Sequence, residues 1–300
     1  MYVRRLLCLL ALSCVLCACP RTQAGARQGT SRHARLERES PTSPFWRTTP
    51  KDSLLAEQVL ESLKGSEIKA VPKLMFVAGN CLYGQPYVAG TLEEFPQEQL
   101  CIYLTRTDCI LFVETCLALA RTAKTGGGFP ELAEELRQSS YRDGRIGAYA
   151  NRLHYTREWA SQGVARGTLQ DMTEALGGIP YDHPVHYMST HPQAYPRMDD
   201  VEAIRAAEAR INAKPFLYIP KEKVGEIVGS LRNGDILCLV SGIEGLDILH
   251  VGMAAQGGDG KIHLLHASSA AKKVLFDPKP LTDYLAGRKS IVGIQVYRPL

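Results

Sequence analysis

The sequence lacks the short motifs that mark nucleotide, serine-hydrolase and zinc-protease chemistry. It contains no G-x-G-x-x-G or G-x-x-x-x-G-K-[ST] loop, no G-x-S-x-G elbow and no H-E-x-x-H pair, and residues 20–300 contain no Cys-x-x-Cys pair. Each of these motifs holds a nucleophile, a phosphate or a metal on a defined turn or helix. His183, His186 and His191 supply three imidazoles, but their H-x2-H-x4-H spacing is not that of a helical two-histidine site. We therefore expect no cofactor and no metal.

A hydrophobic run long enough to cross a membrane is also missing. Residues 1–19 begin with two arginines and continue with a short run of small and aliphatic residues, which is typical of a secretory signal peptide. The run LCAC at residues 16–19 resembles a bacterial lipobox, in which Cys19 is lipidated, and ordinary signal-peptidase cleavage is the alternative. We expect an exported lipoprotein of the bacterial cell envelope, periplasmic and held at a membrane through Cys19.

Residues 20–50 are poor in aliphatic side chains and rich in Arg, Ser, Thr, Gly and Pro, a composition that predicts a flexible tether. Six arginines against two glutamates give this stretch +4, and Arg4 and Arg5 add +2, so the whole-chain charge of +4 leaves −2 for residues 51–300. This nearly neutral part gives no electrostatic support for binding nucleic acid.

Residues 51–300 are long enough for one domain with a substantial core. Apolar periodicity predicts helices over 52–63 and 71–82, and a buried helix from residue 109. Alternating apolar residues, separated by NGD, GIEG, QGGDG and SSAAK turns, predict strands over 236–240, 248–254, 262–267, 273–276 and 290–298. Short turns between successive strands imply an antiparallel sheet. The predicted fold class is α+β, with the buried helix packed across the sheet.

The middle of the chain, residues 129–218, is predicted to be mainly helical, with one helix opening at Thr168 and ending at Gly177. This region is rich in Tyr, Trp, His and Arg, most densely over 141–159. Such side chains suit a groove for a sugar or a peptide carboxylate. Ordinary packing of large side chains explains the composition equally well.

Cys109 lies at the start of the buried helix, which Thr105 or Asp108 can cap. Free N–H groups and the helix dipole favour an anion there, so we expect a lowered thiol pKa and a nucleophilic thiolate. A buried structural cysteine is the alternative. Residues 51–300 contain five cysteines, and an odd number leaves at least one thiol free in an oxidising compartment. The sequence does not determine whether Cys81 pairs with Cys101.

A thiol nucleophile needs a base, and two histidines lie on successive predicted strands. His250 is in the middle of one strand and His266 is at the end of the next. Neighbouring strands lie about 4.8 Å apart, so these two rings can be neighbours. His263, three residues before His266, points to the opposite face of the sheet.

Taken in order, five short motifs resemble those of NlpC-type papain-like cell-wall cysteine hydrolases. They are PYVAG (86–90), DCxxFVE (108–114), NGD (233–235), HVG (250–252) and HASS (266–269). The stretches YRDGRIGAYANRLHY, YMST and GLDILHVG resemble the larger, N-acetylmuramoyl-L-alanine-amidase-like branch. The resemblance implies a papain-like NlpC-type core in a catalytic domain over 51–300, with 129–218 as a large helical insertion specific to the family.

The resemblance also implies roles for individual residues. Cys109 corresponds to the nucleophile, His250 to the general base and acid, and His266 to the residue that orients the base. Tyr87 corresponds to a tyrosine that shapes the oxyanion site, and Asp108 to a residue beside the nucleophile that can also cap the helix.

Other assignments stay open. Asp247, close to the strand of His250, competes with His266 for the orienting role. Arg152, His154 and Trp159 of the insertion, together with Asp108, are candidate contacts for the sugar and the stem peptide.

The resemblance implies a cysteine amidase that hydrolyses the bond between N-acetylmuramic acid and L-alanine in peptidoglycan or its turnover fragments, through an acyl-enzyme. One alternative is an endopeptidase that cuts the stem peptide after D-glutamate. The other is a catalytically idle envelope-binding lipoprotein that keeps the fold.

Overall fold

The computed structural model describes residues 45–300. The predicted signal peptide, Cys19 and residues 20–44 of the tether lie outside the described residues. The last residues of the predicted tether are not flexible chain: Trp46–Arg47 forms strand β1, parallel to β2 at Leu100–Cys101, and Thr49 caps the first helix. The tether prediction was wrong there because tertiary pairing and one cap order a stretch that has few aliphatic residues. Within the described range, no helix has the length and apolarity to span a bilayer.

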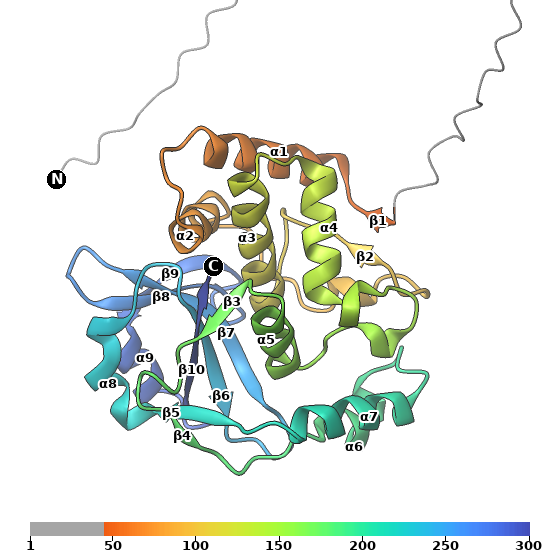
Figure 1. Ribbon diagram of the computed structural model, residues 1–300, viewed down its shortest axis with the longest axis vertical. Helices are drawn as coiled ribbons and strands as arrows, with labels where there is room; N and C mark the ends of the chain where they lie inside the picture. Colours follow the sequence, from red (N-terminus) through yellow and green to blue (C-terminus); the bar gives the residue numbers. More distant parts are fainter. Residues whose placement is uncertain (1–44) are drawn as a thin grey trace, which may run out of the picture. The chain divides into compact units, whose positions relative to one another are not determined.

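Four helices pack together beside the sheet (Figure 1). They are α1 (Pro50–Lys64), α2 (Val71–Cys81), α3 (Cys109–Lys124) and α4 (Phe129–Ser140). The middle of α3 is buried on nearly all sides, because Ala, Leu, Val, Phe and Cys occupy most of its positions. The central position of α3 fixes the depth and the direction of the residue at its start.

The sheet has eight strands in the order β4-β5-β10-β6-β7-β8-β9, with β3 also paired to β10. The three strands from the middle of the chain are β3 (Leu169–Asp171), β4 (Ile179–Pro180) and β5 (Leu217–Pro220). The five C-terminal strands are β6 (Ile236–Ser241), β7 (Ile248–Gln256), β8 (Ile262–Ser268), β9 (Lys273–Pro280) and β10 (Ile291–Pro299). All pairings in it are antiparallel, as the short turns predict. Helices α1 to α4 lie beside one face, and α8 (Val224–Ile227) and α9 (Leu281–Ala286) lie on the other side. The predicted strands and the α+β class are confirmed.

Residues 129–218 are not an entirely helical insertion. Besides α4, they form α5 (Thr156–Ala165), α6 (Tyr187–Thr190) and α7 (Val201–Asn212), but also strands β3 (Leu169–Asp171), β4 (Ile179–Pro180) and β5 (Leu217–Pro220). The helix predicted from Thr168 to Gly177 is wrong, because Leu169–Asp171 instead pairs with Tyr297–Pro299. The edge of β10 needs partners for its backbone N–H and C=O groups, and β3 and β5 supply them.

Candidate active site

Cys109 is the first residue of α3, and Asp108 is its N-cap, as predicted. The Oδ1 atom of Asp108 accepts a hydrogen bond from the Leu111 N–H at 2.9 Å. The chain enters the helix in an extended form, because Thr107 bridges Tyr87 in a parallel arrangement. Cap and bridge together fix the direction of the Cys109 side chain.

A buried carboxylate holds the loop before this helix. The Oδ1 atom of Asp52, in α1, accepts hydrogen bonds from Leu104 N at 2.8 Å, Thr105 N at 2.7 Å and Thr105 Oγ1 at 2.8 Å. Burial alone would raise the pKa of Asp52, but hydrogen bonds from Thr49, Thr105 and Leu104 lower it below its ordinary value. The sequence pattern marks residue 52 only as the start of a helix and gives no sign that its carboxylate anchors this loop.

The two predicted histidines meet on neighbouring strands. The Nε2 atom of His250 lies 2.6 Å from Nδ1 of His266, and the two rings are nearly perpendicular with centroids 4.8 Å apart. This contact leaves Nδ1 as the nitrogen of His250 that is available to a thiol. The backbone of Val251, the next residue on β7, lies close enough to the Cys109 sulfur to lower its pKa. The structure therefore places Cys109 beside the strand of His250, and His250 against His266.

Asp277 completes a chain of polar groups that the sequence did not reveal. Its Oδ2 atom lies 3.4 Å from Nε2 of His266, whose side chain is 1% exposed. The carboxylate belongs to β9, directly after Phe276, which pairs with Leu265. The β8–β9 hairpin register was the signal that could have found it. Asp247, the other candidate, instead accepts a hydrogen bond from the Arg157 N–H at 2.8 Å.

In the resting site the Cys109 thiol and the His250 imidazole are both neutral. Burial and the negative charge of Asp108 raise the pKa of the Cys109 thiol to about 12, and hydrogen bonds from the backbone of Val251, Ile110 and Cys109 lower it by less. Burial, followed by the charges of His266 and Arg288, lowers the pKa of His250 to about 3. The expected lowering of the thiol pKa is therefore wrong in sign, because desolvation outweighs the helix N-terminus.

Two tyrosines approach the thiol from different elements. Burial, and then the negative charges of Cys109 and Asp108, raise the pKa of Tyr87 to about 12, so its hydroxyl is a proton donor at neutral pH. Tyr284, in α9, presents its ring edge to His266 with centroids 5.7 Å apart. The Arg288 guanidinium lies 4.8 Å from the Tyr284 ring centroid. Tyr87 lies near Cys109, and its oxyanion role stays a prediction. The sequence gives no sign of Tyr284 and Arg288.

Arg152 does not present a free guanidinium. It is 6% exposed and bonds Glu98 at 2.9 Å and Glu93 at 3.1 Å. Tyr141 donates its hydroxyl to Glu98 at 2.7 Å. The prediction that Arg152 contacts substrate is contradicted, because its guanidinium is buried and already paired with the carboxylates of Glu93 and Glu98. Burial raises the pKa of Asp108, and the positive charge of Arg152 offsets part of that rise.

The other two predicted contacts differ in their outcome. Trp159 is 2% exposed and belongs to the main core, so the prediction that it contacts substrate is wrong. His154 is half-buried, stacks near Tyr149 and has Nε2 2.8 Å from the Tyr149 carbonyl oxygen. Burial and then Arg152 lower its pKa to about 3, so it is a neutral ring, and its contact with substrate stays a prediction.

The described residues, 45–300, form neither a cluster of metal ligands nor a disulfide. His183 contacts the Leu246 carbonyl oxygen at 2.9 Å and His191 that of Tyr187 at 2.9 Å, so these rings are used separately. Over residues 45–300, no group of three His, Cys, Asp or Glu side chains has the arrangement of a metal site. Cys81 and Cys101 are both free thiols.

The fold and this site define a mixed α+β protein of amidase-like architecture. A family model described as "AmiA-like: N-acetylmuramoyl-L-alanine amidase-like" matches residues 77–294, and the chain belongs to this family. The crystal structure of an N-acetylmuramoyl-L-alanine amidase from Bacteroides uniformis is 35% identical, with a TM-score of 0.73, over 77% of this chain and 99% of that chain.

Two further solved structures are similar. A Bacteroides fragilis protein with a provisional xylanase name is 37% identical, with a TM-score of 0.69, over 73% of this chain and 98% of that chain. The protein LPG0564 from Legionella pneumophila, at 20% identity and a TM-score of 0.65 over 83% and 95%, shares the fold alone. Among curated proteins, no sequence matches.

Replacing Asp108 with asparagine is expected to increase the alkylation rate of Cys109 by iodoacetamide about tenfold near neutral pH. The substitution removes the neighbouring negative charge that raises the thiol pKa, and asparagine caps helices as well as aspartate does. Because the thiolate fraction below a pKa of about 12 rises with pH, the rate should also climb without a plateau through the neutral range. Peptide mass spectrometry follows each thiol, and Cys81 is the internal control. An unchanged Cys109 rate would contradict the assigned role of Asp108.

Proposed function

We propose that this chain is an N-acetylmuramoyl-L-alanine amidase that uses Cys109 as its nucleophile, on an NlpC-type papain-like core. The observation that carries the proposal is the polar chain His250–His266–Asp277 on β7, β8 and β9, next to Cys109, whose sulfur lies near the backbone of Val251. A nucleophile, a base within reach and a group that orients the base are the parts that acyl transfer needs. Membership of the amidase-like family and the amidase from Bacteroides uniformis support the choice of bond.

The neutral resting pair sets the order of events. His250 Nδ1 takes the thiol proton as the Cys109 sulfur attacks the lactyl carbonyl carbon of N-acetylmuramic acid, so a free thiolate does not accumulate. The carbonyl oxygen becomes an oxyanion, for which the Tyr87 hydroxyl and the Cys109 N–H are donors. His250 then gives its proton to the L-alanine nitrogen as the C–N bond breaks.

Water completes the cycle. His250, neutral again, removes a proton from water as the water oxygen attacks the thioester carbon. The C–S bond breaks, the muramoyl acid leaves and the thiol regains its proton from His250. His266 and Asp277 hold the imidazole in one orientation and stabilise its positive charge while it carries the proton.

The glycosidase suggested by the Bacteroides fragilis name fits the site less well. Glycosidases use two carboxyl groups that flank the scissile bond. Of the described carboxyl groups around the site, Asp108 caps α3 and Asp277 contacts His266. Glu114 is 5% exposed and accepts a hydrogen bond from Ser140 at 3.1 Å. Burial raises the pKa of Glu114 to about 8, but the side chain lines a cavity of only about 20 Å³, which is too small for a sugar.

The test incubates the protein and a Cys109→Ala variant with defined muropeptides and with xylan, and reads the products by mass spectrometry. Release of the whole stem peptide from the sugar, absent in the variant, is the expected result. Cleavage after D-glutamate would replace the amidase with the endopeptidase, and xylan products would replace it with the glycosidase. No product from either protein would favour an idle binding module.

Asp277→Asn is expected to lower kcat about tenfold to a hundredfold with little change in KM, because a misoriented base affects the chemical step rather than binding. Asp277 raises the pKa of His266 against the lowering by burial, so its removal should also shift the pH dependence of kcat. Asp259→Asn is the matched control, since that exposed carboxylate contacts His263 instead. A loss of stability with unchanged kcat and pH profile would reduce Asp277 to a packing role.

We also propose that residues 1–19 export the chain and that a lipid on Cys19 holds it in the cell envelope, where this substrate is found. The support is the arginine-led apolar run and the LCAC sequence. Mass spectrometry of the mature N-terminus tests this, and an unlipidated terminus other than Cys19 would overturn it.

A further inference from the structure

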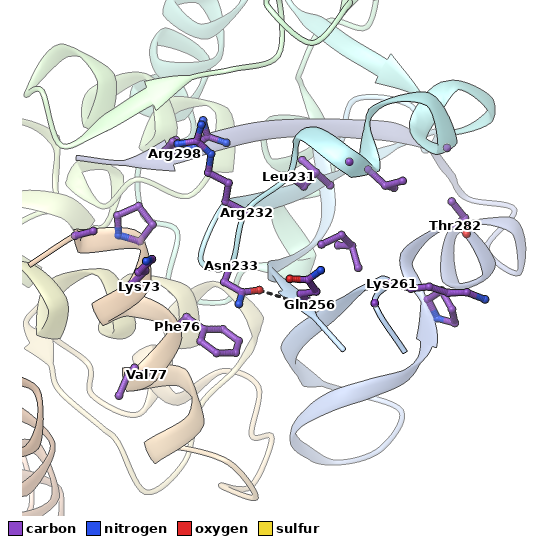
Figure 2. A pocket seen from close by; sticks show the side chains of 18 of the residues that line it. Lys73, Phe76, Val77, Leu231, Arg232, Asn233, Gln256, Lys261, Thr282 and Arg298 are labelled. Carbon is purple, nitrogen blue, oxygen red and sulfur yellow. Dashed lines mark hydrogen bonds between the residues drawn. The ribbon is translucent and has the colours of Figure 1, made fainter. Parts of the chain in front are cut away.

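A second cavity lies away from the Cys109 site. It has a volume of about 960 Å³ and opens between α2 and the turn that joins β7 to β8 (Figure 2). His250 is near the start of β7 and Gln256, which lines the cavity, is at its end. Six residues of strand separate them by about 20 Å, so this cavity is not part of the candidate active site.

The walls of the cavity are mostly apolar. Phe76 and Val77 of α2 are partly buried against the core between helices and sheet, and Val228 and Ile262 against the core on the opposite face. All four also line the cavity, so both cores expose apolar surface to one hollow. Covering such surface is worth about 25 cal/mol per Å². A ligand with an apolar body therefore gains binding free energy when it enters the cavity.

The rim is basic. Lys73, Arg232 and Lys261 line the cavity, and among the described residues none of their side chains pairs with a carboxylate. Figure 2 shows Lys73 on α2 and Arg232 and Lys261 on the facing side. The nearest acid in the same turn, Asp259, accepts a hydrogen bond from the backbone of Lys261 and contacts His263. No aspartate or glutamate lines the cavity itself.

The frame around the cavity is already rigid. Asn233 Oδ1 accepts a hydrogen bond from the Gln256 N–H at 2.6 Å, which Figure 2 marks. Arg298, also on the rim, holds Asp235 with contacts of 2.8 Å and 2.7 Å, so that carboxylate does not neutralise the other cations. A preformed cavity spares the ligand the cost of ordering its site.

We propose that this cavity binds an amphipathic anion, a molecule with a single acyl-type chain and a carboxylate or phosphate head. The apolar walls take the chain, and the cations of the rim, which pair with no carboxylate among the described residues, favour an anionic head. A neutral apolar ligand would leave the cations without a partner. A glycan would find Phe76 as the only aromatic ring in the lining, whereas sugars favour several aromatic faces.

The test titrates the full chain with sodium dodecanoate, below the concentration at which it forms micelles, by isothermal calorimetry. We expect one dodecanoate per chain and a Kd at least tenfold lower than for dodecyl maltoside, which has the same chain and a neutral head. The Lys73→Gln/Arg232→Gln/Lys261→Gln variant should bind dodecanoate at least tenfold more weakly, because the head loses its charged contacts. The matched control, Lys51→Gln/Lys124→Gln/Lys223→Gln, removes the same charge elsewhere and should bind normally.

Flotation with vesicles of phosphatidylglycerol and phosphatidylcholine distinguishes a membrane source from a free one. Association that the rim variant loses and the control keeps would assign a membrane lipid, and binding of free dodecanoate alone would assign a soluble acid. Equal Kd values for dodecanoate and the maltoside, or for the rim variant and its control, would overturn the proposal. Muropeptide hydrolysis by the rim variant should stay unchanged, which separates this result from failure of the proposed amidase activity.

Discussion

Replacing His250 with alanine should lower kcat for muropeptide hydrolysis by about 10³-fold to 10⁴-fold while leaving Cys109 open to alkylation. The thiol has a pKa of about 12, so at neutral pH it depends on a base to lose its proton during attack. In the proposed mechanism the same imidazole protonates the leaving nitrogen, so its loss should affect both halves of the reaction. Rates at several pH values and iodoacetamide labelling of the same samples give both readouts.

His191→Ala is the matched control. His191 is a half-buried histidine that stacks on Tyr187 and hydrogen-bonds within its own turn, away from the thiol. Its removal should leave kcat within about twofold of the unsubstituted protein. If His250→Ala keeps more than about a tenth of the activity, then another group is the base, and the neutral thiol would need a different partner.

The sequence was sufficient to predict features that depend on local pattern. The C-terminal strands were predictable because apolar residues alternate between Gly-rich turns, and a tight turn leaves a strand few partners other than its neighbour. The same reasoning put His250 and His266 on adjacent strands. Asp108 was predictable as a cap because a side-chain oxygen directly before an apolar helix has one favourable role.

Features that depend on distant partners were not predictable. Leu169–Asp171 has no strand pattern of its own and becomes a strand because β10 has an unpaired edge. Asp277 depends on the register of the β8–β9 hairpin, which shifts between His263 and Leu265. Arg152 and Trp159 looked like ligand contacts because composition does not reveal which polar or aromatic side chains the core will enclose.

The protonation state of Cys109 shows the same division between local and distant effects. The local signal is the helix N-terminus, where backbone hydrogen bonds lower the thiol pKa. The larger effect is desolvation by the sheet and by neighbouring elements far away in the sequence. A motif can therefore point to a candidate nucleophile, but the folded environment sets the protonation state of its thiol.

Gly234→Ala should destabilise the protein by at least about 3 kcal/mol, a large effect for the addition of one methyl group. Gly234 has φ of +87°, and a Cβ atom there would lie 1.9 Å from the Pro72 carbonyl oxygen and 2.6 Å from its carbon. Backbone at the start of α2 cannot rotate away as a side chain would. The turn itself is also fixed, because Asp235 bonds both the Arg232 N–H and Arg298. Denaturant unfolding measures the loss of free energy.

Gly84→Ala separates the two causes of this loss. Gly84 has nearly the same φ, +84°, but no atom lies within 4 Å of the position of its Cβ. Its substitution should therefore cost only the left-handed backbone penalty of about 1–2 kcal/mol. Equal losses for the two variants would mean that α2 moves aside easily. A larger loss at Gly234 would show that the NGD turn and the start of α2 form one rigid contact, which also frames the basic cavity.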